Sequence, residues 1–161
     1  MIRYLFYIST ILFVSGCVNK KSDNVDTGYQ NTTDDYDYEL AMKLGADNYG
    51  MKKYIMAFLY RGTNHSVDSL ESIKLQRAHL DNIKRLTEEG KLILAGPFLD
   101  NEDLRGIYLF DVGTIEEAKK LTETDPVIKE GVLFMKLRPW YGSASLIEIR
   151  RLHKRISKEK I

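Results

Sequence analysis

The residues best suited to chemistry lie within residues 69–89, where a histidine interrupts an otherwise apolar helix face. At about 100° per residue, the aliphatic side chains of this stretch gather on one side and the charged side chains on the other. His79 projects from the middle of the apolar side, and Gln76 and Ser72 precede it by one and two turns on the same face. A core avoids such groups because each needs a hydrogen-bond partner, whereas a pocket uses them. The pattern predicts a pocket lined by Ser72, Gln76 and His79, and the alternative is a core histidine with satisfied hydrogen bonds.

Three further residues, His65, His153 and Trp140, have side chains that could take part in chemistry. His65 lies in a polar loop and is expected to be solvated, and His153 falls on the apolar side of a C-terminal helix, where packing is expected. The three histidines lack metal-ligand spacing, and neither a phosphate-binding glycine loop nor a serine nucleophile motif is present, so we expect no metal and no cofactor. Trp140 follows a predicted strand and either lines the rim of the pocket or packs at the strand end.

The N-terminal residues predict export and lipidation. Arg3 precedes an apolar run at residues 4–13, which is too short to span a bilayer and is typical of a signal peptide. Small residues then lead to Cys17, the only cysteine, as in the lipobox of bacterial lipoproteins. We expect residues 1–16 to be a lipoprotein signal peptide and Cys17 to carry lipid that anchors the protein in the cell envelope. Val18 in place of aspartate favours the outer over the inner membrane; an uncleaved N-terminal anchor is the alternative.

Composition places the chain as a whole among ordinary globular proteins. Hydrophobic residues make up 43% and charged residues 29%, and the net charge of +1 gives no support to nucleic-acid binding. Residues 17–50 are predicted to be a lipid-anchored flexible tether, because residues 18–35 are polar and nearly free of large aliphatics. A short helix over residues 38–44, stopped by Gly45, is expected at the end of this tether.

The remaining elements alternate as βαββαβ. We predict strands at residues 53–60, 91–95, 106–112 and 132–137, the second broken by the turn at Gly96 and Pro97, and helices at 69–89 and 114–121. This order indicates an α+β ferredoxin-like sandwich with helices on one sheet face. Because the last strand offers apolar residues to both sides, we expect a second copy to cover the open face, giving a homodimer.

Several motifs occur in an order that resembles the YciI-like (YCII-related) family. They are Arg77-Ala78-His79-Leu80, the run from Gly90 to Pro97, Gly106, Glu116-Glu117-Ala118, Asp125-Pro126 and Arg138-Pro139-Trp140. The resemblance covers residues 51–141, and the chain resembles lipoprotein-type members. It implies a dimeric α+β barrel, a catalytic pair formed by His79 and Asp125, and proton-transfer chemistry on small ring compounds. Val127 stands where an aromatic residue usually follows Asp-Pro, so the shape of the substrate is expected to differ.

Two functions follow. The first is an exported, lipid-anchored dimer in which His79 and Asp125 act as a general acid–base pair on a small, cyclic organic compound. The second is a non-catalytic binding or scaffold lipoprotein that uses the same barrel, in which Asp125 before proline is only a helix cap. Residues 142–161 are predicted to form an amphipathic helix packed on the barrel or across the dimer, with a membrane-lying helix as the alternative.

Overall fold

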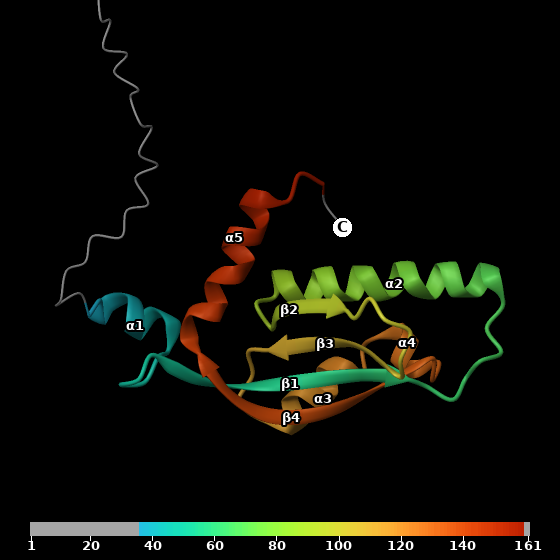
Figure 1. Ribbon diagram of the computed structural model, residues 1–161, viewed down its shortest axis with the longest axis horizontal. Helices are drawn as coiled ribbons and strands as arrows, with labels where there is room; N and C mark the ends of the chain where they lie inside the picture. Colours follow the sequence, from blue (N-terminus) through green and yellow to red (C-terminus); the bar gives the residue numbers. More distant parts are fainter. Residues whose placement is uncertain (1–35, 160–161) are drawn as a thin grey trace, which may run out of the picture. The chain divides into compact units, whose positions relative to one another are not determined.

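The computed structural model describes residues 36–159 of the chain (Figure 1). The predicted signal peptide, Cys17 and the predicted tether up to residue 35 lie outside the described residues. The described part begins with α1 (Tyr38–Leu44), the short helix expected from the sequence. Gly45 ends α1 in the left-handed conformation at φ 68°, and Leu44 is buried, so α1 packs with the rest of the domain. Among residues 36–159, no helix is both long and apolar enough to cross a bilayer.

Four antiparallel strands form one sheet in the order β2-β3-β1-β4. The strands are β1 (Met51–Arg61), β2 (Leu92–Pro97), β3 (Leu104–Phe110) and β4 (Leu133–Ser143). The helices between them are α2 (Ser69–Glu88) after β1, and α3 (Ile115–Thr122) and α4 (Pro126–Lys129) after β3. This order is that of a ferredoxin-like α+β fold, as the sequence predicted.

Side-chain caps fix where the helices of the sandwich begin. The carboxylate of Asp68 accepts a hydrogen bond from the backbone N–H of Glu71 at 2.9 Å, and the Thr114 hydroxyl accepts one from Glu117 at 3.1 Å. Both pairs have capping-box spacing, with the glutamate three residues after the capping residue. Gly90, at φ 77°, turns the chain from the end of α2 toward β2. The caps therefore set the length and register of α2, on which His79 lies.

The main core lies between α2, α3 and one face of the sheet. Alternate residues of β1 point into it, and they pack with residues of α2, α3, β2 and β3. The buried members are Ile55, Ala57, Leu59, Leu86, Leu92, Tyr108, Phe110, Val112 and Ala118. The period-two burial of β1 is therefore the pattern of a strand with one face on a helical layer.

The second face of the sheet is only partly apolar. Near one end, the 3₁₀ helix η1 (Ala144–Glu148) packs Leu146 and Ile147 against Tyr54 and its neighbours. Farther along, β4 presents Phe134, Lys136, Arg138 and Trp140 to this side, opposite Tyr60, Phe58, Met56 and Tyr54 of β1. The expected apolar surface is thus in part covered by the chain itself and in part mixed with basic residues.

The strands β2 and β4 run beyond their predicted ends. The strand β2 continues through Gly96 and Pro97, which pair with Ile107 and Gly106, so the predicted turn there is wrong. A proline is tolerated because β2 is an edge strand. The strand β4 runs to Ser143, six residues beyond the predicted end, because it pairs with the whole of β1.

The C-terminal segment divides into two parts with different environments. Residues of η1 pack on the sheet, whereas α5 (Ile149–Ile156) extends away from it (Figure 1). In α5, Leu152 is 47% and Ile156 is 81% exposed. The first part of the segment therefore packs as expected, but the apolar side of α5 is exposed in a single copy of the described chain.

Candidate functional site

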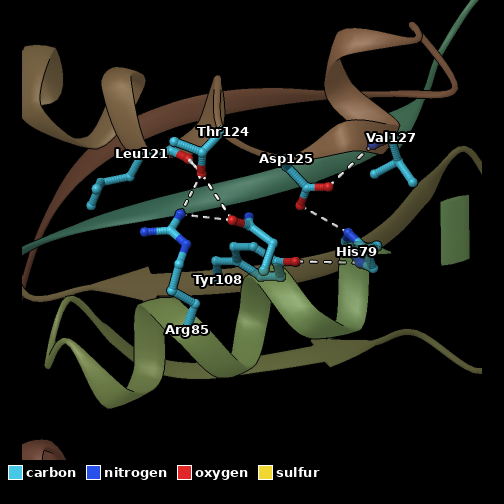
Figure 2. A network of polar contacts seen from close by, with 8 residues as sticks. His79, Arg85, Tyr108, Leu121, Thr124, Asp125 and Val127 are labelled. Carbon is cyan, nitrogen blue, oxygen red and sulfur yellow. Dashed lines mark hydrogen bonds and ion pairs between the residues drawn. The ribbon is translucent and has the colours of Figure 1, made fainter. Parts of the chain in front are cut away.

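A histidine and an aspartate from distant parts of the chain form a buried pair. Nδ1 of His79, on α2, lies 2.8 Å from Oδ2 of Asp125, which precedes α4 (Figure 2). The Asp125 side chain is fully buried and that of His79 retains 11% exposure. The other carboxylate oxygen of Asp125 accepts a hydrogen bond from the backbone N–H of Val127 at 3.2 Å. One carboxylate thus both caps α4 and holds the histidine, so the two roles weighed for Asp125 coexist.

The partners of His79 fix its tautomer. A buried carboxylate accepts hydrogen bonds, so the proton of neutral His79 is assigned to Nδ1 and the lone pair to Nε2. The Tyr108 hydroxyl, from β3, lies 3.3 Å from Nε2 (Figure 2). Burial, together with the charge of Asp125, raises the pKa of Tyr108 well above its usual range. The phenol therefore stays neutral and can donate a hydrogen bond to Nε2.

A second polar cluster braces the segment that carries Asp125. Oδ1 of Asn82, one turn after His79 on α2, accepts a hydrogen bond from Arg85 at 2.8 Å and lies 3.0 Å from the Thr124 hydroxyl. Arg85 also donates to Thr124 at 2.9 Å. Thr124 is the residue before Asp125, so this cluster connects α2 to the turn that presents the carboxylate (Figure 2). The amide nitrogen of Asn82 is buried without a hydrogen-bond partner among the described residues.

An open cavity of about 440 Å³ lies at the end of the sheet where β1 finishes and β4 begins. Its polar lining consists of Arg61, Asn64, His65, Ser72 and Arg105. Its apolar lining consists of Val67, Val132 and Leu133. Ser72 lies two helical turns before His79, so the cavity opens on the helix face that carries the histidine. His79 and Asp125 are not part of its lining.

The remaining predicted site residues lie apart from the pair. Gln76 is exposed, and Trp140 lies on the opposite sheet face, with its ring centroid 6.0 Å from that of Tyr54. His153 is exposed on α5. Among the described residues, no group of three or more His, Cys, Asp and Glu side chains is arranged to hold a metal ion. The structure thus brings His79 to Asp125 and Ser72 to a cavity, but it does not bring Gln76 or Trp140 to either.

The comparison with protein families settles the relationship of the chain. A sequence profile described as the YCII-related domain matches residues 55–140, more than half of the chain. The chain belongs to the YCII-related family. The matched YCII-related region extends from β1 into β4 and contains both His79 and Asp125.

One solved structure is similar to part of the chain. The chain is similar to 5-chloro-2-hydroxyhydroquinone dehydrochlorinase (TftG) from Burkholderia phenoliruptrix AC1100, solved in complex with 2,5-dihydroxybenzoquinone. The identity is 20%, the TM-score is 0.42, and the alignment covers 53% of this chain and 92% of the other. No curated protein matches the chain in sequence.

Sequence reasoning missed three side chains of the YCII-related domain. Successive side chains of β3 point to opposite faces of the sheet, so the strand pattern could have predicted that Tyr108 faces the helices. Asn82 is three residues from His79 and thus on the same helix face, which was also a usable signal. Arg105 gave no signal, because it reaches the cavity through an irregularity in the pairing of β3.

Proposed function

We propose that this YCII-related domain is an enzyme in which His79 and Asp125 carry out general acid–base chemistry on a small, cyclic organic compound. The observation that carries the proposal is the 2.8 Å contact between His79 Nδ1 and a fully buried carboxylate. Such a carboxylate selects one tautomer and orients the ring, which leaves Nε2 as the atom that exchanges a proton with a substrate.

The different burial of Asp125 and His79 assigns them different roles. Asp125 has no exposed surface, so it acts on the substrate only through His79, and we assign it an orienting role. His79 keeps some exposure, as a group that meets a ligand must. Tyr108 stays protonated and lies next to Nε2, where its O–H can hold the free nitrogen until a substrate replaces it. In the proposed step, Nε2 takes a proton from the substrate and returns it to the product.

The experiment is a turnover screen with a matched pair of variants. Thermal-shift hits from a library of small cyclic compounds serve as substrates for residues 36–161, a compact unit with its own core. His79→Gln keeps the size of a polar side chain but removes the base, and we expect it to lower kcat by about 10²-fold or more. His153→Gln makes the same change on exposed α5 and should leave kcat unchanged. If His79→Gln turns over every hit at the original rate, the proposal is wrong.

One observation favours the alternative of a non-catalytic binding protein. His79 is 9% exposed, and the cavity at the end of the sheet is lined by other residues. In that case the pair would serve packing, and ligands would bind without conversion. Thermal-shift hits that bind both wild type and His79→Gln, and that neither protein converts, would select this alternative.

Homodimerisation is a second proposal for the same domain. The face of β1 and β4 away from the helices carries a hollow of about 410 Å³ lined by Phe58, Tyr60, Lys136, Leu137 and Arg138. Covering several hundred Å² of this face would contribute about 25 cal/mol per Å² of apolar area. We expect light scattering on residues 36–161 to give a dimer and Phe134→Glu to give a monomer. A monomeric wild type would refute the proposal.

Attachment to the cell envelope is the third proposal, and it depends on Cys17. We expect the full chain to be recovered from membranes with residues 1–16 removed and with acyl chains on Cys17, in the outer rather than the inner membrane. Cys17→Ser should leave the chain uncleaved, because lipidation precedes cleavage. Mass spectrometry that finds wild type with an unmodified cysteine would exclude the lipoprotein assignment.

A further inference from the structure

The cavity beside the start of α2 has walls that backbone contacts hold in place. The loop of residues 62–67 is joined by three hydrogen bonds to residues 130–132, just before β4. Gly62 N–H donates to the Val132 carbonyl at 2.8 Å, Asn64 N–H to Gly131 at 3.1 Å, and the Asn64 side-chain amide to Glu130 at 2.8 Å. At Gly62, an added Cβ would lie 2.0 Å from the Gly131 carbonyl oxygen, so only glycine permits this approach. His65 follows Asn64 in this loop and lines the cavity.

A local irregularity in the sheet directs Arg105 toward the same cavity. Leu59 of β1 pairs with Gly106, but Tyr60 pairs with Leu104, so Arg105 is the extra residue of a bulge. Bulges re-aim a side chain and occur next to functional sites. The hydrogen bonds of Arg105 both use Nη1, which donates to the carbonyls of Asp100 and Glu102 at 3.1 Å each. The guanidinium is therefore fixed in place through one nitrogen while it lines the cavity.

Arg61 is held more loosely. Its Nη2 is 3.4 Å from Oδ1 of Asn101, and its Nε is 3.9 Å from Oδ1 of Asp103, whose side chain is 88% exposed. Both contacts are at the long limit of their kind, and an exposed ion pair contributes little. A ligand anion could therefore take the place of Asp103 at Arg61 at small cost. The cavity lining formed by the described residues thus contains the guanidinium groups of Arg61 and Arg105 and no carboxylate.

We propose that this cavity binds the anionic group of a small organic acid, with Arg61 and Arg105 as its two cationic contacts. Guanidinium groups bind carboxylates through paired, charge-assisted hydrogen bonds, and the hydroxyl of Ser72 supplies a further donor. The aliphatic walls formed by Val67, Val132 and Leu133 would contact the hydrocarbon part of the ligand. Ser72 is seven residues from His79, about 10 Å along the helix axis. If the proposed acid–base function is correct, small organic acids are the substrate class of that function. The anion site itself is independent of turnover.

The experiment compares benzoate with its neutral isostere benzamide on ¹⁵N-labelled residues 36–161. We expect benzoate to shift the amide signals of Asn64, His65 and Ser72 in a saturable manner, and benzamide to leave them unchanged. Arg61→Gln and Arg105→Gln should each weaken benzoate binding by about tenfold or more. Arg77→Gln removes the same charge from the outer side of α2, where the side chain is 72% exposed, and should leave binding unchanged. Thermal melting of each variant verifies that it is folded.

Each other outcome contradicts the proposal. No saturable shift at millimolar benzoate, equal shifts with benzamide, or equal weakening by Arg77→Gln would each refute an anion site at this cavity. The test is separable from that of the acid–base function, because His79→Gln should bind benzoate as wild type does. Loss of turnover in His79→Gln with benzoate binding intact supports both proposals, whereas turnover without benzoate binding refutes only this one.

Discussion

The exchange Asp125→Asn should reverse the direction of the hydrogen bonds that connect Asp125, His79 and Tyr108. Asparagine has one side-chain oxygen, and the backbone N–H of Val127 requires it as the cap of α4. The amide NH₂ must then face His79 Nδ1, where the carboxylate oxygen now lies at 2.8 Å. A donor at this place forces the histidine proton onto Nε2, which would donate to the Tyr108 oxygen instead of accepting from it. The side-chain shape is preserved, and only the proton positions change.

The free energies follow from the burial of the pair. A hydrogen bond to a charged group contributes about 1.5–3 kcal/mol and a neutral one about half as much, so Asp125→Asn should lower the free energy of unfolding by about 1–2 kcal/mol. Asp125→Ala leaves the N–H groups of His79 and Val127 without acceptors, at about 1–3 kcal/mol each. The expected order of stability is therefore wild type, asparagine, alanine. For a domain of this size, each kcal/mol corresponds to about 3–5 °C in Tm.

The assay is ¹⁵N NMR of the histidine rings together with thermal melting. Long-range ¹H–¹⁵N spectra at a pH where His79 is neutral should show the proton on Nδ1 in wild type and on Nε2 in Asp125→Asn. In catalytic triads the same exchange lowers kcat by about 10⁴-fold, and we expect about 10²- to 10⁴-fold for any turnover found here. A variant that keeps the Nδ1 proton, or one that melts like wild type, would refute the reasoning.

Three other regions yield predictions. Gly62→Ala should lower the free energy of unfolding by more than about 2 kcal/mol in urea titrations, because its Cβ would meet backbone at 2.0 Å. The control Gly113→Ala has open space around it and should be near neutral. Equal stabilities of the two variants would contradict this prediction. Truncation after Tyr141 removes the packing of η1 and should lower Tm by about 10 °C or more. Truncation after Glu148 keeps η1 but removes α5, and it should have a small effect on Tm. Similar melting of the two truncated proteins would show that η1 is dispensable. The hydrogen bond from Lys91 at 2.9 Å lowers the pKa of Glu117 below its ordinary 4.5. The stabilisation by this ion pair is therefore present above pH 4.5 and is lost as the pH falls through the lowered pKa. Glu117→Gln should accordingly reduce Tm slightly at pH 7 and not at strongly acidic pH; a pH-independent difference would exclude the ion pair as its cause.

Hydrophobic periodicity predicted most of the fold. The apolar run at residues 53–60, the amphipathic face of residues 69–89 and the glycine after α1 are local signals, and β1, α2 and α1 lie where these signals indicated. The predictions were wrong where a local signal competes with pairing. Gly96 and Pro97 form a turn signal in isolation, but β3 supplies ladder partners that extend β2 through both residues.

The candidate site was less accessible to sequence reasoning. The apolar face of α2 identified His79 as unusual, but nothing in residue spacing connects it to Asp125, which is 46 residues away. That connection came from the family resemblance. Trp140 was expected near the pocket because the last strand was predicted too short. With β4 extended to Ser143, Trp140 falls on the side opposite the helices, beside Tyr54.

The position of β4 at the margin of the sheet affects how copies of this protein can meet. The outer edge of β4, an 11-residue strand, has no partner strand among the described residues and offers a template on which another chain could add a strand, which is a route to aggregation. Pro139 interrupts that template. A proline has no backbone N–H and is tolerated in an edge strand where that N–H would point to solvent, so the outer edge of β4 lacks one donor at this position. Lys136 and Arg138 add like charges that would oppose each other in two such strands laid side by side. Edge-to-edge polymerisation along β4 is thereby disfavoured.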